Sequence, residues 1–238
     1  MSMSRLYTRR SPTAVAQRSL AERAYHQLRL ELIECRLAPR QRLTEAAVAE
    51  RLAIGKMPAR EALRRLVIEG LVEVVPRHGY AVAPITLQDV RDLFELRIIV
   101  EPAAVERAAG QVDATEYARL KKLSEVGYSI GGRESVRRYC RANTEFHSRL
   151  AGLSGNRRIG DLVAKLLRDS ERLINFILPA HPESELTVQV HGRLLAAVME
   201  GNGALARRIE ERHLRATQQM AVDAVLADTR LANTPLGV

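Results

Sequence analysis

The chain has no tryptophan, only 4% aromatic residues and two cysteines in 238 residues. Few aromatic side chains, together with abundant aliphatic residues and alanine, favour helices over sheet. Cys35 and Cys140 lie far apart without a CxxC pair, and no secretory signal precedes them, so we expect reduced thiols in a cytoplasmic protein. No run approaches the roughly 18 apolar residues that a membrane span needs, and we expect no membrane partner.

Acidic residues are scarce in the first third of the chain. Residues 1–84 hold 15 Lys and Arg against 8 Asp and Glu, a net charge of +7. The remainder of the chain holds 22 Lys and Arg against 20 Asp and Glu, so it contributes only +2 to the total net charge of +9. Because the basic excess is local, we expect a polyanion to bind the N-terminal third.

The segment from Gly55 to Gly70 predicts a short helix with two chemically different faces. Pro58 suits the first turn of a helix, and Gly70 suits the left-handed residue that ends one. Apolar residues recur at helical spacing to form an inner stripe, namely Ala59, Ala62, Leu63, Leu66 and Val67. The outer face carries three arginines, Arg60, Arg64 and Arg65. Such a helix fits the DNA major groove, but an ordinary solvated helix with Glu61 paired to Arg65 explains the same pattern.

The neighbouring segments predict a winged helix-turn-helix over residues 15–85. Apolar spacing indicates a helix from about Leu20 to Cys35, and Thr44 offers an N-cap to a second helix. After Gly70, two β-type runs at 71–75 and 79–83 flank a basic tip, Pro76-Arg77-His78, which predicts a hairpin. Three helices followed by a two-stranded wing are a more specific signal of the winged helix-turn-helix fold than any one of these elements. Residues 1–14 are expected to be a flexible basic arm.

The rest of the chain predicts an antiparallel helical bundle over residues 86–228, so the fold class is mainly α. Thr86 with Asp89 and Asp113 with Glu116 have capping-box spacing. Pro102 is expected to kink or restart the first helix. Short connections separate further helices, at about 134–153, 157–178, 183–200 and 204–227. Residues 229–238 are expected to be a flexible tail.

Three of the six histidines are predicted to meet inside this bundle. Asn143 and His147 lie one turn apart on an inner stripe, and His191 lies on the inner stripe of a later helix. His191 and His213 stand ten residues before and ten after the turn at 201–203, so both lie roughly 15 Å from that turn in an antiparallel pair. The convergence predicts a divalent-metal site at Asn143, His147, His191 and His213. Any one of these histidines by itself is better explained as a hydrogen-bonded core residue.

The N-terminal residues resemble the DNA-binding domain of the GntR family of bacterial transcription regulators. The resemblance rests on Leu43-Thr44-Glu45, on 48–52, on the hallmark Pro-x-Arg-Glu-Ala-Leu at 58–63, on 69–72 and on 79–82. It implies that Lys56 and Arg60 contact DNA, that Arg64 contacts phosphate and that the wing tip at His78-Gly79 enters the minor groove. Arg65 on the outer face of the 55–70 helix and Arg77 at the tip of the hairpin are added for their charge. The expected DNA-binding residues are therefore Lys56, Arg60, Arg64, Arg65, Arg77, His78 and Gly79.

This chain departs from the GntR pattern in two places. It has Gly55-Lys56-Met57 where relatives usually carry Ser or Thr, Arg and Thr, and it has Arg40 where they usually carry Gly. Met57 cannot donate a hydrogen bond, and Lys56 presents a point charge where Arg presents a bidentate fork. The preferred DNA sequence is therefore expected to differ from theirs.

The C-terminal residues resemble the FCD effector domain, on residues 89–97 with Glu101, 143–147, 191–195 and 212–214. The resemblance implies a metal held by an Asp or Asn and three His, with a small organic acid beside it. Asn143 stands where Asp is commoner and gives a weaker ligand, and zinc or nickel is the favoured ion. Arg97 is the candidate for the carboxylate of the acid. An i,i+4 salt bridge from Arg97 to Glu101 is the alternative.

Together these features predict a homodimeric, ligand-responsive transcription regulator, a repressor as in most such families, on a palindromic operator. The alternative from another class is a metal-dependent enzyme, since three histidines with an open position also hold catalytic zinc. Against it, no carboxylate is placed by the sequence as a general base near the cluster. A third hypothesis, a protein that coats DNA without sequence preference, predicts steep salt dependence and no preferred site.

Overall fold

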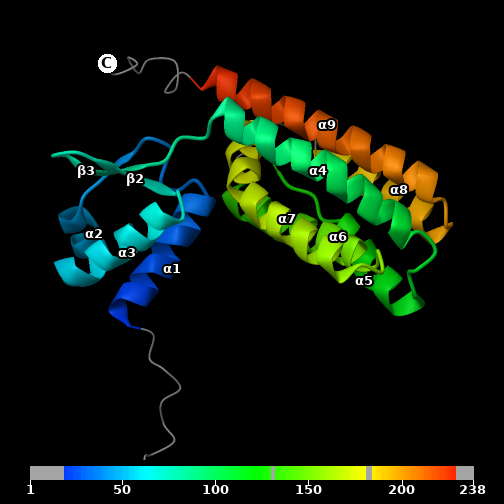
Figure 1. Cartoon of the computed structure of the whole chain (residues 1–238), viewed down its shortest axis with the longest axis horizontal. Coiled ribbons are helices and arrows are strands. Elements are labelled where there is room, and N and C mark those ends of the chain that lie inside the picture. The colour runs from blue at the N-terminus through cyan, green and yellow to red at the C-terminus, as the bar shows by residue number, and fades with distance from the viewer. Residues whose placement is uncertain (1–18, 130–131, 181–183, 229–238) are drawn as a thin grey trace, which may run out of the picture. The chain divides into compact units, whose positions relative to one another are not determined.

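The computed structural model describes residues 19–129, 132–180 and 184–228, and Figure 1 shows that helices dominate them. The mainly α fold class is confirmed. The expected arm at 1–14 and tail at 229–238 lie outside the described residues. Two compact units divide the chain: residues 1–30 with 42–81, and residues 31–41 with 82–238.

The first unit is built as a winged helix-turn-helix. Its helices are α1 (Leu20–Ile33), α2 (Glu45–Arg51) and α3 (Lys56–Ile68), and its strands are β1 (Arg42–Leu43), β2 (Val72–Val75) and β3 (Gly79–Val82). The strand order is β1-β3-β2, with β1 antiparallel to β3. The expected two-stranded wing is present as β2 and β3, and β1 adds a third strand that was not predicted, because two residues are too few to show alternation in the sequence. The first helix also ends two residues before Cys35.

The predicted two-faced helix is α3. Pro58 lies in its first turn, and Gly70, with φ of +71°, follows its end. Four residues of the predicted inner stripe are fully buried, Ala59, Ala62, Leu63 and Leu66, and the fifth, Val67, is half-buried. Burial of each leucine stabilises the unit by roughly 1.5–3 kcal/mol, which fixes the orientation of the helix and leaves Arg60 and Arg64 exposed.

The second unit is a helical bundle. Its helices are α4 (Leu87–Ala108), α5 (Ala114–Ser124), α6 (Arg133–Gly152), α7 (Arg157–Ile177), the 3-10 turn η1 (Leu178–Ala180), α8 (Ser184–Met199) and α9 (Gly203–Ala227). In Figure 1, α4 runs along α9 and beside α7, α6 packs on α7, and α8 packs on α9. None of the helices in the described ranges is both long and apolar enough to cross a membrane.

The helix ends follow the predicted caps with one difference. The backbone N–H of Asp89 donates to Thr86 Oγ1 at 3.0 Å and that of Thr86 to Asp89 Oδ2 at 2.9 Å, which confirms the capping box. Asp113 accepts from the N–H of Glu116 at 2.7 Å. The carboxylate of Glu116, however, accepts a hydrogen bond from Arg149 on α6 at 3.1 Å. It thereby joins α5 to α6.

Pro102 does not restart the first helix of the bundle, because α4 continues through it to Ala108. The missing N–H and the ring of an interior proline cost about 3 kcal/mol. Apolar contacts on both sides of the helix offset that cost: Ala104 packs with Val163 of α7, and Val105 packs in a cluster with α8 residues. Tertiary packing therefore overrides the local signal.

Candidate functional site

The exposed face of α3 presents Lys56, Arg60 and Arg64, as the sequence predicts. Arg60 is also held in place. Its Nε donates to Glu45 Oε1 at 2.8 Å, and the hydroxyl of Tyr80 on β3 donates to the same oxygen at 3.2 Å. The hydrogen bond from Arg60 lowers the pKa of Glu45, so this carboxylate is ionised at neutral pH. Glu45 therefore orients the central arginine of the helix.

Arg65 occupies a different environment from the other arginines of α3. It is half-buried, and its guanidinium carbon lies 3.9 Å from the ring centroid of Tyr25 on α1. The Tyr25 hydroxyl in turn donates to Glu69. This cation–π contact joins α1 to α3. A DNA contact by Arg65 stays a prediction, and the packing role is the one that the structure gives it.

The tip of the wing carries Arg77 and His78, both exposed. The N–H of His78 bonds to the carbonyl of Val75 at 3.0 Å and closes the turn, while Arg77 adopts the left-handed region at φ +67°. Gly79 has φ of +90°, and a Cβ at this position would lie 2.9 Å from the carbonyl oxygen of Leu43. Gly79 is therefore required by the backbone of the wing, and a DNA contact by this residue or by its neighbours Arg77 and His78 stays a prediction.

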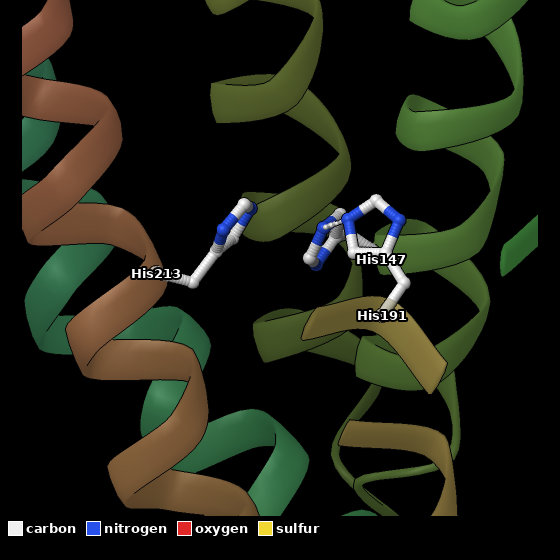
Figure 2. A group of neighbouring side chains, drawn as sticks. All are labelled: His147, His191 and His213. Atoms are coloured by element: carbon white, nitrogen blue, oxygen red, sulfur yellow. Dashed lines mark hydrogen bonds between the residues drawn. The ribbon is translucent and has the colours of Figure 1, made fainter. Parts of the chain in front are cut away.

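The three predicted histidines converge in the bundle from three different helices. His147 comes from α6, His191 from α8 and His213 from α9, and Figure 2 shows their rings turned toward one another. The Nε2 atoms of His147 and His191 are 3.2 Å apart, and the ring centroids of His191 and His213 are 5.4 Å apart. One ring nitrogen from each histidine lies within 4.8 Å of the others. The prediction that His191 and His213 are neighbours, made from their equal distances to the turn at 201–203, is thus confirmed.

Two of the histidines are held neutral. Burial lowers the pKa of His191 well below its usual range and that of His213 to about 4. Burial acts on His147 in the same direction, but the carboxylate of Glu210 outweighs it and raises the pKa. Neutral imidazole is the form that binds metal.

Glu210 is the residue of this site that the sequence reasoning missed. It lies on α9, one turn before His213, and is fully buried, with Oε1 3.1 Å from Nδ1 of His147. Neither carboxylate oxygen has a well-aligned hydrogen-bond donor within the described ranges. Burial would raise its pKa, but the charge of His147 outweighs burial and lowers it. The sequence offered one signal for Glu210: it precedes His213 by three residues and therefore lies on the same face of the helix.

The donor set fits a metal ion. Tetrahedral zinc holds imidazole nitrogens at 2.0–2.1 Å, which puts two such nitrogens about 3.4 Å apart, close to the 3.2 Å between His147 and His191. A buried carboxylate also needs a neighbouring positive charge, which either a protonated His147 or a bound cation would supply. Glu101, His147 and Glu210 form a second close group of possible ligands on the carboxylate side. The three-histidine group is the better match to zinc or nickel because it offers three neutral nitrogens.

Asn143 and Arg97 lie beside the histidines. Both line a cavity of about 30 Å³ that His213 also lines. The Tyr139 hydroxyl donates to Asn143 Oδ1 at 3.2 Å. Arg97 is buried, and its Nε donates to Glu101 Oε1 at 2.6 Å, which is the salt bridge that the sequence offered as the alternative. A contact from Arg97 to an effector stays a prediction.

Two family models match the chain. The model of the FCD domain matches residues 92–216, more than half of the chain, and the model described as bacterial regulatory proteins, gntR family, matches residues 20–82. Among curated proteins, the chain is 27% identical to the uncharacterized HTH-type transcriptional regulator YdhC of Bacillus subtilis, over 77% of this chain and 83% of that protein. It is 23% identical to the HTH-type transcriptional repressor RspR of Escherichia coli, over 82% and 85%.

Solved structures show the same fold. A GntR regulator from Rhodococcus superposes with a TM-score of 0.67 and 24% identity, over 86% of this chain and 98% of that one. McbR/YncC of Escherichia coli superposes with a TM-score of 0.63 and 21% identity, over 89% and 99%. At these identities the likeness concerns the arrangement of helices and strands alone.

Proposed function

As a member of the GntR family of bacterial regulatory proteins that carries an FCD domain, this chain is a transcription regulator, and we propose that it represses transcription as a homodimer. A small organic acid bound beside a divalent metal ion would control its affinity for DNA. The metalloenzyme alternative is not supported, since the named relatives are transcription regulators.

The observation that carries the ligand-responsive part of the proposal is the convergence of two buried histidines, His147 and His191, and the half-buried His213 with Glu210. His147, His191 and His213 would hold a zinc or nickel ion, with Asn143 as a fourth, weaker ligand. When bound, the ion supplies a positive centre that attracts a carboxylate. Glu210 would face Nδ1 of His147 and so leave Nε2 for the metal.

DNA binding is proposed to use α3 and the wing of each protomer. α3 would enter the major groove with Lys56, Arg60 and Arg64, while Arg77 and His78 would reach the minor groove. Two copies related by two-fold symmetry would bind the two halves of a palindrome. For the acid to regulate binding, it must have different affinities for the two dimer arrangements.

The DNA-binding assignment is tested by footprinting on DNA upstream of the gene for this protein. Arg60→Ala should abolish selective protection, since Arg60 is the oriented arginine of α3. Arg168→Ala, an exposed arginine on α7, is the matched control for lost charge and should keep the footprint. An unchanged footprint with Arg60→Ala would contradict the assignment of α3.

The metal assignment is tested by elemental analysis of the purified protein. The double variant His191→Ala, His213→Ala should lose bound metal while DNA binding stays measurable, because the winged unit has its own core. His26→Ala, on the exposed side of α1, should keep the metal content of the wild type. Equal metal content in the double variant would overturn the site.

A further inference from the structure

The cavity beside the histidines is too small for an organic acid. It has a volume of about 30 Å³, which accommodates about two water-sized groups, as many as the oxygen atoms of one carboxylate. Sites for organic ligands generally occupy roughly 300–1,000 Å³. One carboxylate fits there, so the rest of a ligand must lie elsewhere.

A larger groove between α8 and α9 adjoins this cavity. Its volume is about 290 Å³, and four residues line both spaces, namely Thr187, His213, Thr217 and Met220. His213, one of the proposed metal ligands, therefore stands between the inner cavity and the groove. A ligand that approaches the metal from α8 and α9 would leave its outer part in this groove.

Three arginines line the groove and give it a positive charge. Arg193 comes from α8, and Arg208 and Arg212 lie one turn apart on α9. All three are exposed, and no ion pair joins any of them to an acidic residue in the described part of the chain. Arg97 of the inner cavity differs, since Glu101 already pairs with it. The groove thus offers cations that the protein itself leaves available.

Aliphatic side chains line much of the rest of the groove. Leu186, Val190, Leu205 and Ile209 contribute side chains to it. Aliphatic walls with guanidinium groups suit a hydrocarbon chain that ends in an anionic group, because the chain packs on the walls while the arginines bind the charge. Neutral sugars and simple amines both lack the anionic group that the arginines would bind.

The charges of the inner site limit it to one carboxylate. A divalent ion contributes two positive charges, buried Glu210 removes one, and Arg97 and Glu101 offset each other. One positive charge remains, which one carboxylate neutralises. A second negative charge on the ligand would have to be balanced by the arginines of the groove.

We propose that the α8–α9 groove binds the outer end of the effector through Arg193, Arg208 and Arg212, and that the effector is an aliphatic acid with two anionic ends. This inference rests on the proposed carboxylate site at the metal. One carboxylate occupies the inner cavity, the aliphatic chain passes His213, and the second anion meets the arginines.

The test compares acids of equal length that differ only at the outer end. Calorimetric titration of the zinc-loaded full chain with succinate, glutarate and adipate is set against butanoate, pentanoate and hexanoate. We expect at least one diacid to bind about tenfold or more tightly than its matched monoacid. In the triple variant Arg193→Gln, Arg208→Gln, Arg212→Gln this preference should disappear, while affinity for the monoacids stays within about twofold.

The control is Arg215→Gln, an exposed arginine of the same helix that pairs with Glu211 and does not line the groove. It should keep the preference for diacids. Equal binding of monoacids and diacids by the wild type would overturn the inference while leaving the metal-bound carboxylate intact. A preference that survives the triple variant would also overturn it. Failure of all six acids to bind would contradict the proposed effector site itself.

Discussion

Glu210 shows how one buried side chain defines the chemistry of the bundle. Its carboxylate is fully buried and reaches Nδ1 of His147 at 3.1 Å. A histidine that ligates a metal through Nε2 keeps its proton on Nδ1, and a carboxylate there fixes the orientation of the ring. We therefore assign Glu210 the part of a positioning residue in the proposed metal centre.

Glu210→Gln is expected to weaken zinc binding about 10- to 100-fold, the usual effect of losing such a partner. Competition with a chromogenic chelator measures the affinity. The neighbouring Glu211→Gln is the control, because Glu211 is paired with Arg215 on the outer face of α9. Equal zinc affinity in wild type and Glu210→Gln would show that the carboxylate does not support the site.

Glu45 has the corresponding role at the DNA-binding surface. It accepts hydrogen bonds from Arg60 and Tyr80. Glu45→Gln should lower the ratio of operator to scrambled-DNA affinity, because Arg60 loses its charged partner while the surface becomes more positive. Fluorescence anisotropy with both DNAs measures this ratio. Glu61→Gln removes the same charge from the exposed face of α3 and should leave the ratio closer to wild type.

At the scale of elements, the start of α9 is fixed by its contact with α4. A Cβ on Gly203 would lie 2.7 Å from the carbonyl oxygen of Glu106, so Gly203→Ala must push the two helices apart. We expect a loss of about 1–3 kcal/mol in the free energy of unfolding of the metal-free protein. Urea denaturation measures the change.

Gly192→Ala is the matched control on α8, where nothing lies within 4 Å of the added methyl group. Because alanine favours the helix, this variant should gain about 0.5–1 kcal/mol. Similar effects of the two substitutions would contradict the close approach of α9 to α4.

Elements with strong local signals were predictable from the sequence. Pro58 and Gly70 mark helix ends through their backbone conformations, and the caps at Thr44 and Thr86 do so through local hydrogen bonds; the structure confirms all four. The meeting of His191 and His213 followed from their equal distances to one turn, and His147 was expected beside them because it lies on the inner stripe of its own helix. These features depend on neighbours in the chain or on a single hairpin of helices.

Features that depend on distant contacts were not predictable. The strand β1 exists because it pairs with β3, and α4 continues through Pro102 because both sides of it are packed. The position of Arg65 over Tyr25 depends on how α1 meets α3. Each outcome is decided by tertiary packing, which local sequence patterns do not encode.

At the scale of the whole molecule, metal binding should stabilise the native chain. A ligand that binds only the folded state at about 100 times its Kd adds about 2.7 kcal/mol. Chelation should therefore lower the thermal midpoint of the wild type and leave that of His191→Ala, His213→Ala unchanged. Calorimetry with and without chelator measures both. Equal shifts in the two proteins would place the stabilising metal elsewhere.

The central claim is that one chain joins a selective DNA-binding unit to a metal-dependent acid site. The most direct measurement is the affinity of the zinc-loaded protein for its operator, chosen by selection from genomic fragments, with and without the diacid that binds best. We expect the diacid to change wild-type affinity at least fivefold, within the usual range of allosteric coupling. The His191→Ala, His213→Ala protein should bind the operator without responding. An equal response in both proteins, or none in the wild type, would contradict the claim.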